Sequence, residues 1–161
     1  ELCALKWSDF DFEKSIVTVS RTMQRIRNRD GNGTKIIVTS PKSRTSLREI
    51  PIPDFMKKTL AEMRTDADSF VLTGNTKFTE PRTIQYRFKS ILKRLNLPQI
   101  NFHSLRHMFA TKCVSLGIDV KTLSEILGHS SVKITLDRYV HSSMSRKQSC
   151  MKLFSDNVLV A

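Results

Sequence analysis

Residues 102–141 read FHSLRHMFATKCVSLGIDVKTLSEILGHSSVKITLDRYVH, and this stretch indicates both the local fold and the chemistry of the chain. His103 and Arg106 stand three residues apart, and they are followed by a histidine at His129 and a tyrosine at Tyr139. Arginine offers a planar fork of donors to phosphate oxygens, and histidine can donate to a developing charge or move a proton. A tyrosine hydroxyl is an available nucleophile. The combination favours chemistry on a phosphate.

The apolar residues of this stretch repeat at helical spacing and are interrupted by helix-ending signals. A first helix is predicted from the positions Leu105, Met108, Phe109, Cys113 and Leu116. Gly117 is a good C-terminal stop for it. Asp119 caps a second, short helix, which Gly128 ends. Ser130 or Ser131 begins a third helix. The stretch therefore predicts three short helices in succession.

Apolar residues at helical spacing also occur outside residues 102–141. Apolar residues predict a helix over 54–64 and a longer helix over 84–95, which Pro98 stops. One face of the longer helix is basic, with Arg87, Lys89, Lys93 and Arg94. The segment 143–154 is a candidate for a last helix.

Nearer the N-terminus the pattern changes to that of strands. The β-branched segments 15–20 and 34–39 flank a strong turn signal at 30–33, which predicts that the second strand returns from the first. The segment 47–52 alternates as a third strand, and Pro51 places it at a sheet edge. We therefore predict an α+β fold, mostly helical, with a small three-stranded antiparallel sheet near the N-terminus.

The charge of the chain indicates a polyanionic partner. The 161 residues include 27 Lys and Arg against 15 Asp and Glu, which gives a net charge of +12. Such a surplus favours nucleic acid first and an anionic membrane surface second. A general role in solubility is the simpler interpretation, but the basic residues cluster, as in 25–29, 42–48 and 82–94.

The three cysteines, Cys3, Cys113 and Cys150, are far apart and show no metal-finger spacing. Neither a disulfide framework nor a zinc finger is supported, and a reducing cytoplasm is the expected compartment. The sequence shows no signal peptide and no apolar run near the roughly 18–20 residues of a spanning helix.

Three interpretations of the first histidine pair compete. His103, Arg106 and His107 could be ordinary polar residues, which is the default for any one of them. His103 and His107 lie one helical turn apart and could bind a metal, with His129 or Cys113 as a further ligand. Alternatively, His103 and Arg106 hold a phosphodiester. The third interpretation is favoured because Arg106 would be a poor neighbour for a bound cation and the whole chain is basic.

Tyr139 and Lys42 are each unremarkable when taken alone. A helical tyrosine is usually half-buried packing with its hydroxyl in water, and a turn lysine is usually solvated. A phenol has a pKa of about 10, so it needs nearby positive charge or a proton acceptor to attack at neutral pH. The surroundings of Tyr139 supply that positive charge. His129 follows a helix-ending glycine, where capping is its ordinary role.

These motifs together resemble the catalytic domain of tyrosine recombinases, the phage integrase family, and most closely integrases of bacterial mobile elements. The segment 103–111, HSLRHMFAT, resembles the family's His-x-x-Arg box. The segment 127–131, LGHSS, followed by Tyr139, is similar to its second histidine and nucleophile. The segment 40–51 is similar to the sheet turn that holds the catalytic lysine, and 1–9 resembles the sequence after the first catalytic arginine.

The resemblance implies a mechanism and a set of roles. Tyr139 would attack a DNA phosphodiester, leaving a 3′-phosphotyrosine and a free 5′-hydroxyl, and a partner strand would reverse the step. Arg106 would neutralise the phosphate oxygens, and His103 and His129 would bind the same oxygens or assist proton transfer. Lys42 would protonate the departing oxygen. No metal, ATP or other cofactor is implied.

The resemblance also implies that 1–161 is a partial catalytic domain. The family's first arginine would precede Glu1, as would the start of the domain and the N-terminal DNA-binding domains. We therefore expect the chain alone to be inactive or impaired as a DNA strand transferase.

The implied partners are double-stranded DNA and other protomers, as a tetramer in a recombination synapse, with no membrane and with a place at the cytoplasmic nucleoid. A type IB topoisomerase-like enzyme and a DNA-binding relic that no longer cleaves are the alternatives.

Overall fold

The computed structural model describes residues 1–28, 31–39, 46–140 and 144–158 of the chain. Its helices, in chain order, are two 3₁₀ turns at Leu2–Ala4 and Trp7–Asp9, then α1 (Asp54–Met63), α2 (Pro81–Arg94), α3 (Ser104–Ser115), α4 (Val120–Leu127), α5 (Val132–Tyr139) and α6 (Met144–Val158). Each predicted helix is therefore present, with its ends shifted by a few residues.

The strands form two small antiparallel sheets in the described part of the chain. The strands are β1 (Phe10–Asp11), β2 (Ile16–Val19), β3 (Thr22–Arg27), β4 (Thr34–Thr39) and β5 (Arg48–Pro51). One sheet has the order β1-β2-β5, and β3 pairs with β4 in the other. In the first sheet Ile16 lies opposite Pro51, and in the hairpin Arg27 lies opposite Thr34. The predicted fold class is confirmed, including a three-stranded sheet whose edge is β5.

The membership of that sheet differs from the prediction. The segment 34–39 does not return on 15–20; it pairs with β3, which the sequence presented only as a polar, basic stretch. A hairpin pairs the segments that lie on either side of its loop; β3 ends at Arg27, shortly before the turn signal, whereas β2 ends at Val19. The place of 34–39 in the three-stranded sheet is taken by β1, a short strand that the sequence pattern did not indicate.

Helix capping follows the sequence signals. The Asp119 carboxylate accepts the backbone N–H of Thr122, and the Ser131 hydroxyl accepts the N–H of Lys133, so both side chains satisfy free donors at helix starts. Gly128 ends α4 in the left-handed conformation, with φ 69°. These caps set the short turn that separates α4 from α5.

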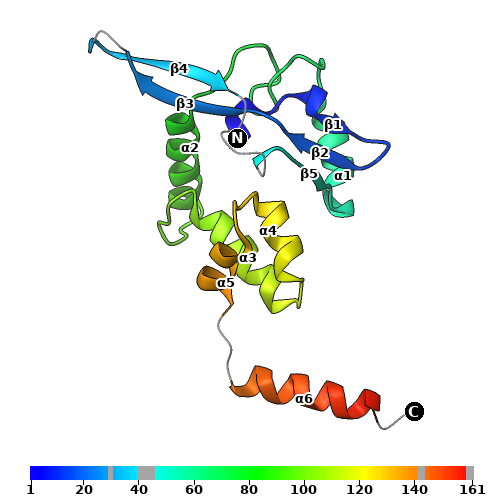
Figure 1. Cartoon of the computed structure of the whole chain (residues 1–161). Coiled ribbons are helices and arrows are strands. Elements are labelled where there is room, and N and C mark those ends of the chain that lie inside the picture. The colour runs from blue at the N-terminus through cyan, green and yellow to red at the C-terminus, as the bar shows by residue number, and fades with distance from the viewer. Residues whose placement is uncertain (29–30, 40–45, 141–143, 159–161) are drawn as a thin grey trace.

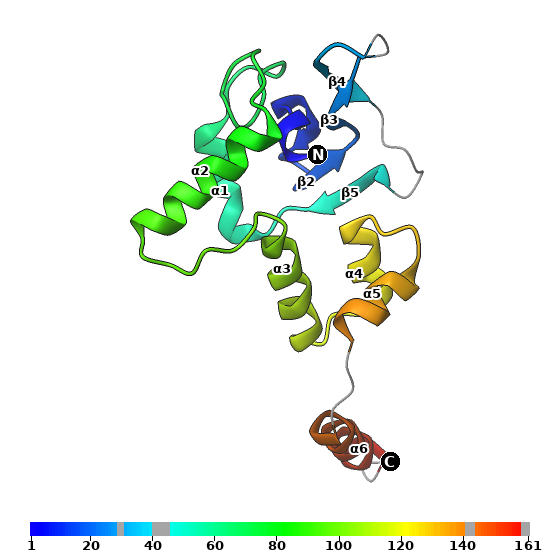
Figure 2. The ribbon, with the colours of Figure 1, turned by 90° about the vertical axis from the view of Figure 1, so that its left-hand side faces the viewer.

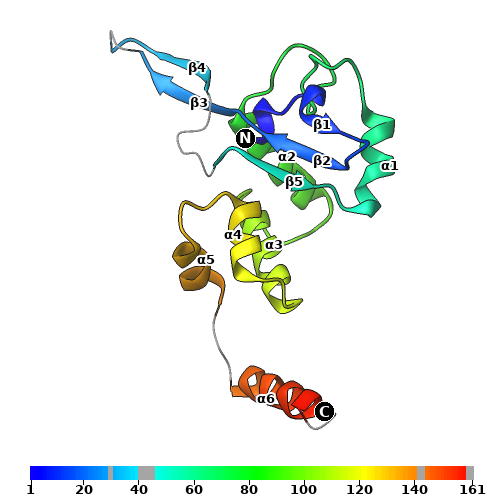
Figure 3. The same ribbon diagram turned by 45° about the vertical axis from the view of Figure 1, so that its right-hand side comes forward.

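The helices α3, α4 and α5 gather beside β5, as Figures 1 and 3 show. Their buried core consists of Ala110, Cys113, Val114, Leu123, Leu127 and Tyr139. A second core lies under the β3–β4 hairpin and is built from Cys3, Ala4 and Met23, with Ile36, Phe70, Leu72 and Ile84 packed against them. The first core includes Tyr139, one of the predicted site residues.

Helix α6 stands apart from the other elements, as all three ribbon views show, most clearly Figure 2. It presents apolar side chains to solvent, including Met151, Leu153 and Phe154, each more than half exposed. Within the described residues, no helix is long and apolar enough to cross a membrane.

Candidate active site

His103 and Arg106 lie at the start of α3, next to the end of α4. The Arg106 guanidinium donates through Nη2 to the carbonyl oxygen of Leu127, 2.6 Å away, and so binds one of the free carbonyls that end α4. Burial lowers the pKa of Arg106, although guanidinium remains charged at any physiological pH. Desolvation, followed by the charges of His107, Arg106 and Arg138, lowers the pKa of His103.

A hollow of about 390 Å³ opens beside these residues, and we call it the basic hollow. Its polar lining is formed by Ser46, His103, Arg106, His129, Ser130 and Arg138. Two guanidinium groups and two imidazoles therefore face one small volume. Such a set can neutralise and hydrogen-bond the non-bridging oxygens of a phosphate.

His129 is held in the wall of the basic hollow by a buried hydroxyl. Its Nδ1 lies 2.7 Å from Oγ1 of Thr135, a residue with no exposed surface. Burial lowers the pKa of His129, and the charges of Arg106, Arg138 and Arg48 act in the same direction. A neutral imidazole is therefore favoured there at neutral pH.

Tyr139 is the last residue of α5, and it is largely buried in the core of α3, α4 and α5. The residue is 8% exposed. Its hydroxyl shares a hydrogen bond with Nδ1 of His107, at 2.8 Å. Its ring lies parallel to that of His129, with ring centroids 6.4 Å apart. The phenol thus sits between one imidazole at its hydroxyl and another at its face.

Arg48, at the start of β5, joins three parts of the chain around the turn that holds His129. Its Nε donates to the carbonyl oxygen of Ile126 at 2.8 Å, and its terminal nitrogens donate to both Glu1 carboxylate oxygens at 3.0 Å. A Cβ placed on Gly128 would lie 2.8 Å from Nη1 of Arg48. The guanidinium therefore packs directly against the backbone before His129.

The structure brings together four of the five predicted site residues. His103, Arg106 and His129 line the basic hollow, and Tyr139 stacks on His129. Lys42 lies outside the described residues, so its role stays a prediction. Among the described residues, no group of three or more His, Cys, Asp or Glu side chains is arranged to hold a metal ion.

Three contributors were missed by sequence reasoning. Arg138 and Thr135 face His129 from α5, and no motif indicated either of them. His107 was considered as an ordinary polar residue or a metal ligand, yet it contacts Tyr139. Helical periodicity places residues on a face of their own helix but does not say which residue of another helix meets them.

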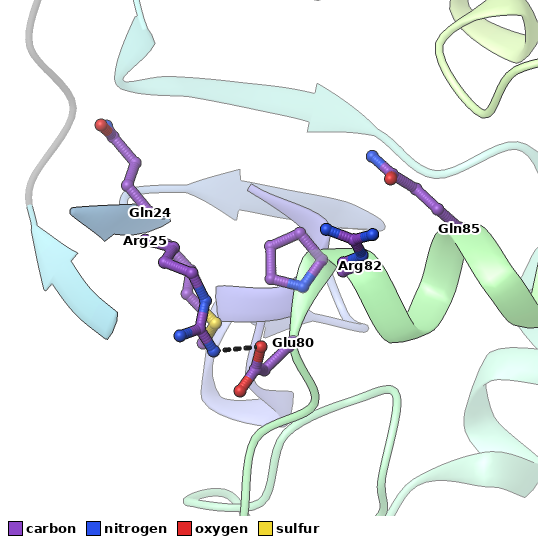
Figure 4. Close-up of a pocket in the computed structure, with 7 residues that line it drawn as sticks. Gln24, Arg25, Glu80, Arg82 and Gln85 are labelled. Carbon is purple, nitrogen blue, oxygen red and sulfur yellow. Dashed lines mark hydrogen bonds and ion pairs between the residues drawn. The ribbon is translucent and has the colours of Figure 1, made fainter. Parts of the chain in front are cut away.

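A second polar hollow, of about 500 Å³, lies between β3 and the start of α2 (Figure 4). An ion pair between Arg25 and Glu80 crosses it. Arg82, on its wall, donates through Nε to the hydroxyl of Tyr86 at 2.9 Å. This hollow has no histidine or buried tyrosine in its lining, so the candidate chemistry belongs to the basic hollow.

Comparison with known proteins places the chain in a family. Residues 1–146 match the phage integrase family, so the chain belongs to it. A tyrosine recombinase XerC-like protein of Caldanaerobacter subterraneus subsp. tengcongensis is 33% identical, over 97% of this chain and 45% of that protein. The transposase from transposon Tn916 of Enterococcus faecalis is 28% identical, over 94% of this chain and 41% of its own length. The chain spans less than half the length of both relatives.

Solved structures agree with this assignment. The Tn1549 transposon integrase in complex with circular intermediate DNA is similar with a TM-score of 0.73 and 26% identity, over 95% of this chain and 54% of that one. The XerA recombinase gives a TM-score of 0.63 at 26% identity, over 96% of this chain and 50% of that one.

Proposed function

We propose that this chain is the catalytic part of a site-specific DNA recombinase of the integrase type, which cuts and rejoins DNA through a 3′-phosphotyrosine. The observation that carries the proposal is the placement of Tyr139. Its buried phenol stacks on His129, which lines the basic hollow together with His103 and Arg106. A nucleophile beside fixed cations is the arrangement that phosphoryl transfer requires, because the chemistry depends on positioning and charge neutralisation.

In the proposed reaction, Oη of Tyr139 attacks the phosphorus of a DNA phosphodiester. The Oη–P bond forms, the P–O5′ bond breaks, and the chain becomes joined to the 3′ phosphate. Arg106 neutralises the non-bridging oxygens, and His103 and His129 hydrogen-bond to them. A 5′-hydroxyl from a second strand then attacks the phosphotyrosine and releases Tyr139. The phosphotyrosine bond conserves the energy of the broken phosphodiester bond, so rejoining requires no nucleotide hydrolysis.

Two catalytic residues of this proposal, a lysine and an arginine, lie outside the described residues. We assign Lys42 the protonation of the departing 5′ oxygen, as the family resemblance implies. We also propose that 1–161 is part of a longer recombinase whose first catalytic arginine precedes Glu1. If so, the chain alone should cleave poorly, and an N-terminally extended form should restore cleavage.

Double-stranded DNA is the proposed substrate, with further protomers assembled as a tetramer in a recombination synapse. The charge of +12 supports the DNA partner. The DNA bound in the Tn1549 integrase structure supports it from a similar fold. Action on DNA would place the protein at the nucleoid.

The decisive experiment traps the covalent intermediate with a nicked suicide DNA substrate and the full-length protein that includes this chain. We expect a covalent adduct that maps to Tyr139 and is abolished by Tyr139→Phe. Tyr86→Phe is the matched control, because Tyr86 is the other of the chain's two tyrosines and is 57% exposed.

The outcomes separate the alternatives. No adduct with the wild-type protein, or an adduct that survives Tyr139→Phe, contradicts the proposal and leaves a DNA-binding relic or a different nucleophile. An adduct followed by relaxation of supercoils without strand exchange would indicate a type IB topoisomerase-like enzyme instead.

A further inference from the structure

The hydroxyl of Tyr139 is bound by His107, not by either histidine of the basic hollow. Nδ1 of His107 lies 2.8 Å from Oη, and the two ring centroids are 5.7 Å apart. This distance is that of a good hydrogen bond. His107 comes from α3 and Tyr139 from the end of α5, so the contact depends on how the two helices pack.

The other two described histidines are engaged elsewhere. His129 faces the ring of Tyr139, and its Nδ1 is bound to the buried hydroxyl of Thr135. His103 contacts the ring of His107 edge-on, with centroids 4.9 Å apart, and lines the basic hollow. Both therefore face the position proposed for the phosphate oxygens, which leaves His107 as the imidazole at the nucleophilic atom.

The surroundings favour a proton transfer within this pair. Tyr139 is 8% exposed, so little of the residue is in contact with bulk water. The titratable and charged groups nearby are His103 and Arg106 from the start of α3, His129 from the turn after α4, and Arg138 from α5, with Arg48 and the Glu1 carboxylate paired to each other beside Arg106. The proton acceptor in hydrogen-bond contact with the Tyr139 hydroxyl is the imidazole of His107, and guanidinium has no acceptor.

We propose that His107 is the proton acceptor for Tyr139 in DNA cleavage, an inference that rests on the function proposed above. The phenol O–H donates to Nδ1 of neutral His107. As the Oη–P bond forms and the P–O5′ bond breaks, the proton moves from Oη to Nδ1, and the 5′ oxygen takes a proton from the proposed acid, Lys42. In rejoining, the 5′-hydroxyl loses its proton to Lys42, and His107 returns its proton to Oη.

The kinetic test measures single-turnover adduct formation on suicide DNA by the full-length protein. We expect His107→Gln and His107→Ala to slow cleavage by about 100-fold or more, the usual contribution of a positioned base. DNA affinity should be unchanged. Added imidazole should restore part of the rate of His107→Ala. Met108→Gln, a 60% exposed neighbour on α3, is the control for substitution in this helix and should cleave like the wild type.

A substrate with a bridging 5′ sulfur separates the two proton transfers. Sulfur leaves without a proton, so this substrate should rescue Lys42→Ala but leave the defect of His107→Gln in place. Rescue of His107→Gln by the same substrate would show that His107 acts on the leaving group and would overturn the assignment.

A spectroscopic test can be made without measuring DNA cleavage. The proposal requires neutral His107 to carry its proton on Nε2, leaving Nδ1 as acceptor, and ¹⁵N chemical shifts of the ring distinguish the two tautomers. We expect the Nε2–H form in the wild type and a changed Nδ1 shift in Tyr139→Phe. A proton found on Nδ1 at neutral pH would exclude the proposed transfer.

The results also separate this inference from the proposed function. If the wild type forms the adduct and His107→Gln forms it at the same rate or faster, His107 is not the acceptor and the recombinase function stands. A faster variant would mean that His107 restrains the nucleophile. If the wild type forms no adduct, both proposals fall.

Discussion

Arg138 is one of several charges that influence the protonation of the site histidines. It lines the basic hollow from α5, and its charge contributes to lowering the pKa of both His103 and His129, after the larger effect of desolvation. The two imidazoles are therefore held neutral near neutral pH. Neutral imidazoles add little to the positive charge of the hollow, so the arginines supply most of it.

We predict that Arg138→Gln raises the pKa of His103 and of His129. Removing a nearby cation reduces its repulsion of the imidazolium, so the protonated form is favoured and the titration moves to higher pH. Histidine ring signals followed by NMR across pH 4 to about 9 would measure both values. Lys133→Gln, an exposed charge removal on the same helix, is the control. A lower or unchanged pKa at both histidines would contradict the electrostatic account.

Thr135 is the residue that fixes His129. We predict that Thr135→Val destabilises the fold by about 1–3 kcal/mol, because Nδ1 of His129 loses its partner and stays partly buried. Denaturant unfolding would measure the change, and suicide-substrate trapping should show slower cleavage. Thr135→Ser keeps the hydroxyl and should cleave close to the wild-type rate. Equal cleavage by Thr135→Val would argue that the hydrogen bond does not orient His129.

The sequence indicated only part of the site at this scale. His103, Arg106, His129 and Tyr139 stand in motifs whose residue types suit chemistry on a phosphate, and the family resemblance implied their roles, which stay predictions. Thr135 and the contact between His107 and Tyr139 arise where separate helices meet. The spacing of residues along the chain does not predict contacts between different helices. These contacts became known only from the packing of the helices in the structure.

At the scale of elements, the end of α4 is the organising feature. Arg48 from β5 and Arg106 from α3 donate to successive carbonyls, those of Ile126 and Leu127. Cations suit this position because a helix C-terminus has free carbonyls and partial negative charge. The sheet, α3 and α4 are thereby joined at the turn before His129.

We predict that Gly128→Ala is more damaging than Gly117→Ala, although both glycines have positive φ. A left-handed alanine costs about 1–2 kcal/mol, and Gly117 should show that cost alone because an added Cβ meets nothing within 4 Å. At Gly128 the Cβ would also displace the Arg48 guanidinium, which its bonds to Glu1 and Ile126 hold in place. Unfolding free energies and cleavage rates would measure the difference; equal losses would contradict it.

The strands show where periodicity misleads. The sequence located β2 and β4 from their β-branched content and β5 from its alternation, and Pro51 correctly marked an edge. It missed β3, whose arginines look like loop composition although one face packs Met23 into the core. The turn signal at 30–33 begins at a residue outside the described part of the chain. The strand that follows it, β4, pairs with the strand that directly precedes it, which is a constraint of hairpin geometry rather than of composition.

For the whole molecule, the net charge of +12 predicts strong salt dependence of DNA binding. Each phosphate neutralised contributes about −0.9 to the slope of log affinity against log salt. If the chain contacts about six to ten phosphates, affinity should fall at least about 10³-fold between roughly 50 and 200 mM salt. Fluorescence anisotropy on a labelled duplex would measure the slope. An affinity insensitive to salt would contradict an electrostatic interface.

Tyr139 belongs to the helical core as well as to the candidate site, so two requirements act on one position. A copy of this chain released from the proposed need to cleave DNA would still need an aromatic ring to fill the space between α3, α4 and α5. Phenylalanine would fill it without a buried hydroxyl to satisfy. Among copies that have lost the proposed cleavage, we therefore expect phenylalanine at this position more often than small residues, and the absence of a single oxygen atom would record that loss.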